Sequence, residues 1–500
     1  MSRNRTASIP LLSNGRGATR WALVGLLLAA WALRLPSLLE MPLHPDEALY
    51  GHWGLLIGQG RDPWLTGGSI YKPPLLPYLV SVFQLVFGST TLTLRLPGVT
   101  AGMIMVPLVG ALAHGIYEDV WTGVGAMVAV ALSPFAIELS GTAFPDPPMV
   151  MLGLGACVAA ARGRARWAGL LAGLSFATKQ TGLVWLPLVF VLSMTRGLEH
   201  PGRAGGFVVA YLIPALLTFA WDGIRVALGA DSFWLAGIEG YGGLRLIWPQ
   251  ELWPRLRAWI RILGASFESK GINAVLVLGV PLLGGRGLVR PPATRRAFFD
   301  ALFTSYCLIY MLLHWLVAFP LWGRYILPVV PMLALLLGRV VRVVACLLRR
   351  RVKVTLPQWL GPMMLALLLV VPAGNACAGG SALAADRVAY RGIEDVVLFF
   401  AELPEGSVVY HHWLGWHYRY MLFDAPVYLA YWPTPAWLAR DVQAFGDREP
   451  RYIAFPAWES AARVEHSLDE VGYRLQEALS VARGGTQSFV VYRIVPTSDK

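Results

Sequence analysis

Long apolar runs separated by short polar segments fill the first three quarters of the chain. A helix that crosses a bilayer needs about 20 predominantly apolar residues. The segments that approach this length and composition are 21–40, 95–115, 121–140, 145–161, 206–228, 272–285, 299–319, 325–345 and 357–376. The stretch 167–195 is also apolar, but it contains Lys179 and Gln180 near its middle. It is therefore either one interrupted helix or two short helices that turn at this point.

Positive charge in the loops decides how these segments are threaded. If the short apolar segment 74–87 lies along the interface and 167–195 crosses twice, every strongly basic loop falls on one side of the membrane. Those loops are 3–20, 162–166, 196–203, 286–296 and 339–353. Cytoplasmic loops carry the excess of Lys and Arg, so this side is expected to be cytoplasmic. The prediction is about eleven spans, with the loop 41–73 and the C-terminus on the outer face.

The pattern changes after Ala376, where short apolar runs alternate with charged residues. Runs such as 406–410, 451–455 and 488–494 are typical of strands, and 459–471 is typical of a helix. We therefore predict an all-α polytopic membrane bundle followed by a small extracytoplasmic α/β domain. The expected divisions are a cytoplasmic tail at 1–20, a membrane domain at 21–376 with its first outer loop at 41–73, and a soluble domain at 377–500.

Composition supports a membrane protein and argues against binding to nucleic acid. Of 500 residues, 56% are hydrophobic and 14% charged, which is more apolar than soluble domains, where about 45–50% is usual. The net charge of +12 comes from basic residues in short runs between apolar segments, as cytoplasmic loops have. The four cysteines lack the paired spacing of a metal knuckle or a disulfide framework.

Two adjacent carboxylates, Asp46 and Glu47, follow the first apolar segment directly. One interpretation is structural, because Pro45 favours a helix start here and the helix macrodipole favours acids in the first turn. The other is functional: one carboxylate acts as a general base on an acceptor hydroxyl.

Three further polar residues are expected at the same membrane face, and each has two interpretations. Lys72, beside Pro73 and Pro74, is either an interfacial anchor or a charge that holds a lipid phosphate. Asp146, between two prolines, either ends a helix or belongs to a site. Arg324 is either an interfacial anchor or a second phosphate-binding group.

The predicted topology places Asp46, Glu47, Lys72, Asp146 and Arg324 on one face. Carboxylates and cations at one membrane surface suit transfer from a phosphate leaving group to a hydroxyl acceptor.

Several motifs recur in an order that resembles the C-type glycosyltransferases, in particular the family of the protein O-mannosyltransferases and the lipid A aminoarabinose transferases. The similarity covers about residues 20–345. It rests on Asp46-Glu47, Lys72-Pro73-Pro74, Arg95-Leu96-Pro97, Ser133-Pro134, Asp146, Lys179-Gln180-Thr181-Gly182 and Arg324-Tyr325 with Leu327-Pro328 and Pro331.

This resemblance implies an inverting glycosyltransferase of the plasma membrane that takes a sugar from an undecaprenyl-phosphate or dolichyl-phosphate donor. The acceptor would be a hydroxyl group of a protein, a glycan or a lipid. The resemblance implies that Asp46 is the base, that Lys72 and Arg324 steady the phosphate, and that Asp146 orients the acceptor or supports the site. Glu47 would support Asp46.

No cofactor is firmly predicted, and a divalent metal is only a weak alternative. Relatives that hold a divalent metal have a carboxylate immediately before the lysine, and Tyr71 occupies that position here. His411, His412 and His417 lie in a Trp- and Tyr-rich stretch, and we expect structural roles for them.

Two other function classes are compatible with the composition. A non-enzymatic lipid or solute transporter would place its charges near the bilayer midplane and often shows two related halves, whereas the candidate charges here cluster at one boundary. A membrane-anchored binding protein would leave the charges of the first outer loop unexplained.

Overall fold

The computed structural model describes residues 16–68, 70–197, 200–240, 245–289, 294–352, 357–381, 385–446 and 448–497. Most of the predicted tail 1–20 and parts of the basic loops 196–203, 286–296 and 339–353 lie outside these residues.

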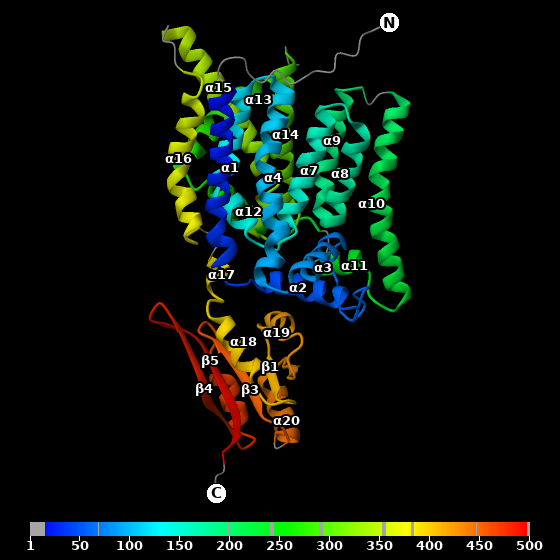
Figure 1. Cartoon of the computed structure of the whole chain (residues 1–500), viewed down its shortest axis with the longest axis vertical. Coiled ribbons are helices and arrows are strands. Elements are labelled where there is room, and N and C mark those ends of the chain that lie inside the picture. The colour runs from blue at the N-terminus through cyan, green and yellow to red at the C-terminus, as the bar shows by residue number, and fades with distance from the viewer. Residues whose placement is uncertain are drawn as a thin grey trace.

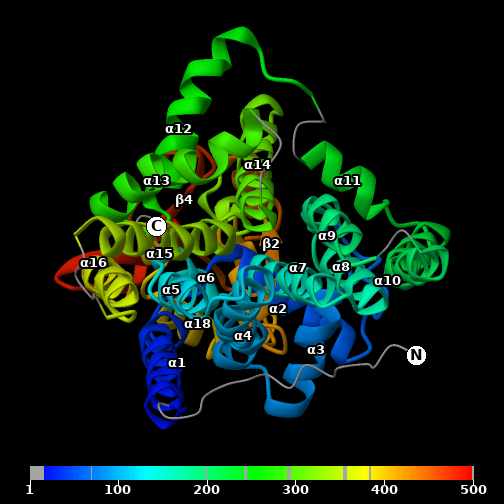
Figure 2. The same cartoon turned by 90° about the horizontal axis from the view of Figure 1, so that it is seen from above.

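The N-terminal three quarters of the chain form a helical bundle. Its elements are α1 (Arg16–Leu39), α2 (Pro45–Gly58), α3 (Leu75–Phe87), α4 (Thr91–Tyr117), α5 (Val120–Ala131), α6 (Pro134–Ser140), α7 (Asp146–Ala161), α8 (Ala165–Thr178), η1 (Gln180–Val184), α9 (Trp185–Met194), α10 (Pro201–Ala227), α11 (Phe233–Gly240), η2 (Pro249–Glu251), α12 (Leu252–Ala265), α13 (Lys270–Val289), α14 (Arg295–Leu316), η3 (Gly323–Ile326), α15 (Val330–Val352) and α16 (Leu360–Cys377). Figure 1 shows α2 and α3 at the end of the bundle that faces the C-terminal domain. Seen from above, α4, α5 and α7 lie near the middle, and α1, α10 and α16 lie at the periphery (Figure 2).

The helices match the predicted multi-pass architecture. Within the described residues, six helices are long and apolar enough to cross a membrane, or up to eight if the bent pairs α5–α6 and η2–α12 with α13 each count as one span. Each of the eleven apolar segments expected from the sequence coincides with a helix or a bent pair. The shorter helices α7, α8 and α9 correspond to the expected segments 145–161 and 167–195. The all-α membrane bundle is therefore confirmed.

The interrupted stretch 167–195 forms two helices, α8 and α9, joined by the short η1. Lys179 between them has an extended backbone with φ −155° and ψ 138°. Gly182 allows the tight turn, because a Cβ atom at this position would lie 2.4 Å from the backbone of Ser175.

The C-terminal part is a sheet covered by helices on both faces. Its elements are α17 (Ala385–Val388), α18 (Ile393–Ala401), β1 (Val408–His411), α19 (Gly415–Met421), β2 (Tyr428–Tyr431), α20 (Pro435–Phe445), β3 (Arg451–Pro456), α21 (Ala462–Asp469), β4 (Tyr473–Arg483) and β5 (Thr486–Pro496). The strand order is β2-β1-β3-β5-β4, with β1 parallel to both β2 and β3 and with β5 antiparallel to β3 and β4. This is the small α/β domain that the sequence predicts, with β2 and β4 as additional strands.

Alternation along β1 explains the two helical layers. Val409 packs in one core with α18 and α19, whereas Val408 and Tyr410 pack in another with α20 and α21. Successive side chains of a strand point to opposite faces, so one short strand serves both cores.

Candidate functional site

A capping box fixes the helix that carries the two adjacent carboxylates. His44 is the N-cap of α2, and its side chain accepts a hydrogen bond of 3.0 Å from the backbone N–H of Asp46. The carboxylate of Glu47 accepts one from the backbone N–H of His44, also at 3.0 Å. This reciprocal arrangement satisfies N–H groups that would otherwise lack partners at a helix start. It also fixes the place of Asp46 in the first turn.

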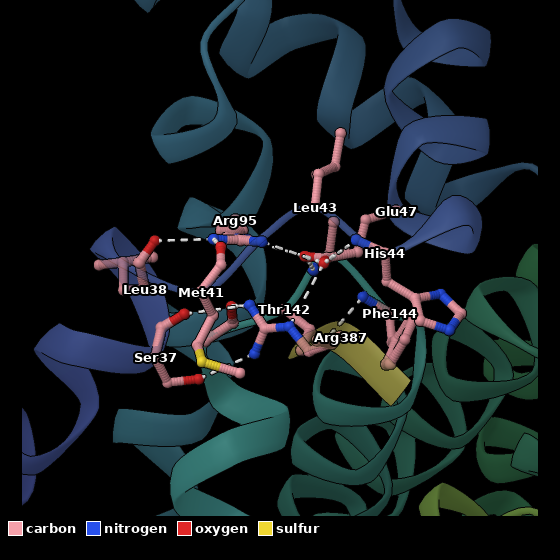
Figure 3. Close-up of polar contacts among 12 residues, drawn as sticks. Ser37, Leu38, Met41, Leu43, His44, Glu47, Arg95, Thr142, Phe144 and Arg387 are labelled. Carbon is pink, nitrogen blue, oxygen red and sulfur yellow. Dashed lines mark hydrogen bonds and ion pairs between the residues drawn. The ribbon is translucent and has the colours of Figure 1, made fainter. Parts of the chain in front are cut away.

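Glu47 is fully buried in a polar cluster (Figure 3). The guanidinium of Arg95 donates to both of its carboxylate oxygens, at 2.8 and 3.1 Å. The backbone N–H of Ala143 donates a further bond at 3.0 Å. Burial would raise the pKa of Glu47, but the positive charges of Arg95 and Arg387 lower it to about 2. These contacts tie Glu47, and with it the start of α2, to α4 and to the backbone before α7.

Arg95 and Arg387 connect this cluster to three parts of the chain. Arg95 also donates to the carbonyls of Leu38, Met41 and Pro42, where α1 leads into the loop. Arg387, from α17, donates to Ser37 and to the carbonyl of Gly141 (Figure 3). The same buried cluster therefore joins the bundle, the loop 41–73 and the start of the C-terminal domain.

Asp46 makes a different kind of contact from its neighbour. Its Oδ2 atom lies 2.6 Å from Nη1 of Arg324, and the two side chains are 23% and 13% exposed. The Arg324 guanidinium also lies over the rings of Trp322 and Phe144, at 4.3 and 4.7 Å from their centres. Burial would raise the pKa of Asp46, but the charge and hydrogen bond of Arg324, together with His44 and Lys72, hold that pKa below its usual value. Asp46 is therefore an accessible and ionised carboxylate at neutral pH.

A second ion pair lies deeper in the bundle. Oδ1 of Asp146 is 2.6 Å from Nζ of Lys179, and both side chains are almost completely buried. The Lys179 ammonium also lies 4.5 Å from the centre of the Tyr325 ring. The second oxygen of Asp146 is buried and has no hydrogen-bond partner among the described residues. Lys179 was not among the predicted site residues; the signal for it was a lysine in the middle of an apolar stretch.

Lys72 lies close to both ion pairs. Only 4% of this residue is exposed. Burial and the charges of Lys179 and Arg324 lower its pKa well below the usual value. Gln180 donates a hydrogen bond of 2.7 Å to the carbonyl of Tyr71, which fixes the end of the loop beside η1. Three cations and two carboxylates are thus gathered from loops that are far apart in the sequence.

Two cavities lie on either side of η3. The first, here called the polar cavity, has a volume of about 550 Å³. Its walls include His44, Asp46, Glu138, Arg324, Asp386, Arg387, Tyr390 and Trp413. The second, here called the apolar cavity, has a volume of about 230 Å³. Its walls include Lys72, Lys179, Trp234, Ile238, Leu313, Phe319 and Tyr325. Arg324 lines the polar cavity and Tyr325 the apolar cavity. The short helix η3 therefore lies between the cavity that contains Asp46 and the cavity that contains Lys72 and Lys179.

The histidines of the C-terminal domain make contacts within the protein. His417 is fully buried and lies 2.8 Å from the carbonyl of Leu43, and His412 lies 2.8 Å from the carbonyl of Trp432. In the part of the chain that the structure describes, no three His, Cys, Asp or Glu side chains are grouped to hold a metal ion.

Comparisons with known proteins confirm the resemblance expected from the sequence. Residues 71–221 match the family model described as dolichyl-phosphate-mannose-protein mannosyltransferase. A comparison with curated protein sequences finds no match.

Solved structures share the fold over nearly the whole chain. The crystal structure of ArnT from Cupriavidus metallidurans bound to undecaprenyl phosphate matches with a TM-score of 0.63 and 16% identity, covering 95% of this chain and 98% of that one. Its apo state matches with the same TM-score and 17% identity, over the same shares of both chains. The Archaeoglobus fulgidus oligosaccharyltransferase in its apo form matches with a TM-score of 0.51 and 13% identity, covering 95% of this chain and 75% of that one. The chain therefore has the fold of these membrane proteins.

Proposed function

We propose that this protein is a membrane glycosyltransferase that moves a sugar from a polyprenyl-phosphate donor to a hydroxyl acceptor. The observation that carries the proposal is the pair of Asp46 and Arg324, which lines the polar cavity, while Tyr325 beside Arg324 lines the apolar cavity that contains the two lysines. The family match and the shared fold support the same reaction class.

The donor fits the apolar cavity. Trp234, Ile238 and Phe319 offer apolar walls to the first isoprene units, and Lys72 and Lys179 line the same space. A phosphate placed between these lysines and Arg324 would gain charge-assisted hydrogen bonds in a water-poor site. One of the relatives with this fold was crystallised with undecaprenyl phosphate, which is a lipid of this class.

The acceptor fits the polar cavity, where Asp46 is exposed. The acceptor hydroxyl attacks the anomeric carbon as the bond from that carbon to the phosphate oxygen breaks. The hydroxyl proton passes to Asp46, and the bonding electrons leave with the polyprenyl phosphate. A single displacement from the face opposite the phosphate inverts the anomeric centre.

The ion pairs give the other residues separate tasks. The charges on Lys179 and Arg324 stabilise the negative charge that develops on the phosphate as it leaves, and so does Lys72, whose protonated form the bound phosphate favours. Asp146 pairs with Lys179 and so supports the phosphate site, which is one of the two roles expected for it.

The membrane orientation follows from loop charge. We propose that the end of the bundle with α2, α3 and the C-terminal domain faces outward and that the protein lies in the cell membrane, because the basic loops belong to the opposite end.

Transfer of labelled sugar from a panel of polyprenyl-phosphate sugars tests the proposal, with purified protein in lipid and membrane extract as acceptor. Asp46→Asn preserves shape and removes the base, so turnover should fall by about 100-fold or more. Glu251→Gln, in an ion pair on η2, is the matched control and should keep wild-type turnover. Near-normal transfer by Asp46→Asn would disprove the assigned base, and no transfer by wild type from any donor would favour the transporter.

A further inference from the structure

The parallel half of the C-terminal sheet contains a topological switch point. From β1 the chain passes to β2 on one side, and it then crosses to β3 on the other side of β1. The connecting helices α19 and α20 pack on opposite faces of the sheet. In open α/β sheets with this arrangement, ligands bind in the crevice outside the carboxyl ends of the strands.

Aromatic side chains gather at these strand ends. Trp413 follows β1, Tyr431 ends β2, and Trp458 follows β3. Their exposed fractions are 57%, 51% and 49%. A single exposed ring is common on a protein surface, whereas a contiguous group of exposed rings often marks an interaction site.

The rings form a continuous row that begins in the polar cavity. Tyr390 and Trp413 both line that cavity together with Asp46. The Trp458 ring centre lies 6.4 Å from that of Tyr390 and 6.4 Å from that of Trp413. His412 continues the row, at 4.8 Å from Trp413 and 5.6 Å from Tyr431.

A buried imidazole, that of His411, packs beside the end of the row. His411 is 5% exposed, and neither ring nitrogen has a hydrogen-bond partner among the described residues. Its ring centre lies 5.8 Å from that of Tyr431. Burial lowers the pKa of His411 to about 4, so the ring is neutral at physiological pH and one nitrogen donates while the other accepts. Nδ1 of His411 faces Gly415 in α19, where a Cβ atom would lie 2.5 Å from it, so this imidazole supports the row from beneath.

We propose that this row, comprising Tyr390, Trp458, Trp413, His412 and Tyr431, binds the saccharide part of the acceptor and leads its hydroxyl to Asp46. The assignment of a direction towards Asp46 rests on the proposed function, whereas saccharide binding does not. The C–H face of a sugar ring packs on an aromatic face, and its hydroxyls remain free to bond to groups such as Glu459, which lies beside Trp413.

The position of the row favours a saccharide over other occupants. A polypeptide would find its backbone partners along the open edge of β2, whereas the rings stand at the strand ends. An acyl chain would need an enclosed apolar groove, whereas these rings alternate with imidazole and carboxylate groups.

The test uses the full-length protein in lipid nanodiscs on a printed glycan array. Wild type and Trp416→Ala should retain the same glycans, because Trp416 is an exposed tryptophan of the same domain outside the row. Combining Trp413→Ala with Trp458→Ala should weaken this binding by about tenfold or more. Trp413→Phe with Trp458→Phe should restore most of it.

Two further measurements distinguish a saccharide from other ligands and distinguish this inference from the proposed function. Serine-containing peptides and liposomes replace the glycans in parallel, and a response to either of these instead of glycans overturns the inference. So does equal glycan binding by wild type and the double alanine variant, or binding of no glycan by wild type. Asp46→Asn should bind glycans like wild type while losing turnover, so failure of the catalytic proposal leaves a distinct signature.

Discussion

The neighbouring carboxylates of Asp46 and Glu47 in α2 differ in their burial and in their hydrogen-bond partners. Around Glu47 the protein is closed, and Arg95 and two backbone N–H groups satisfy the carboxylate completely. Around Asp46 the protein opens into the polar cavity, and the pair with Arg324 stays partly exposed. The buried pair of Glu47 and Arg95 has all its hydrogen bonds made within the protein and stabilises the fold. In the accessible pair, Asp46 and Arg324 can each replace the other by a contact to a substrate.

The largest effect expected from breaking this contrast is on stability. Arg95→Leu leaves the Glu47 carboxylate buried with only Arg387, 3.8 Å away, as a salt-bridge partner. Removing one partner of a buried ion pair costs about 3–5 kcal/mol, so thermal unfolding in detergent should begin at a much lower temperature. Arg324→Leu is the comparison and should lose activity with a smaller change in stability. Equal destabilisation by both would show that the two pairs do the same job.

An effect of intermediate size is expected on donor binding, where the lysines and Asp46 should differ. Lys72→Ala should raise the donor concentration needed for half-maximal turnover by about tenfold or more, because a charge-assisted contact to phosphate is lost. Lys179→Ala should act in the same direction, whereas Asp46→Asn should leave donor binding intact. An unchanged response to donor in both lysine variants would refute the phosphate site.

The smallest effect concerns pH. Arg324 helps to hold the pKa of Asp46 below its usual value, and activity requires the deprotonated carboxylate. Arg324→Gln should therefore raise this pKa and move the acidic limb of the kcat/KM profile to higher pH. Lys72→Gln should move it less, because Arg324 is the stronger cationic influence on Asp46. A limb that stays in place in Arg324→Gln would mean that another group titrates.

Charge and hydropathy were enough to predict the bundle and the common face of Asp46, Lys72, Asp146 and Arg324. Both properties can be read from consecutive residues, without knowing which segments pack together. The partners of these residues depend on packing between distant segments, and the sequence did not reveal them. Arg95 was part of a recognised motif, but its bidentate contact with Glu47 appears only when α4 packs beside α2.

The C-terminal domain shows the same limit. The buried strands β1 and β3 have compact apolar runs and were predicted. Strand β4 is largely exposed and mixes polar with apolar residues, and β2 is only four residues long, so neither produced a clear pattern. The switch point depends on strand order, which no single segment encodes.

The contact between α2 and α19 has a consequence for biosynthesis. His417 reaches the carbonyl of Leu43 across 374 positions of sequence, and the Tyr420 ring packs so closely on Gly51 that a Cβ atom there would lie 2.7 Å away. At about 5–20 residues per second, a ribosome needs roughly 20–75 s to cover that interval. The loop that carries Asp46 is made among the first segments, yet its ion pair from Arg61 to Asp424 forms only after translation has passed α16 and α19.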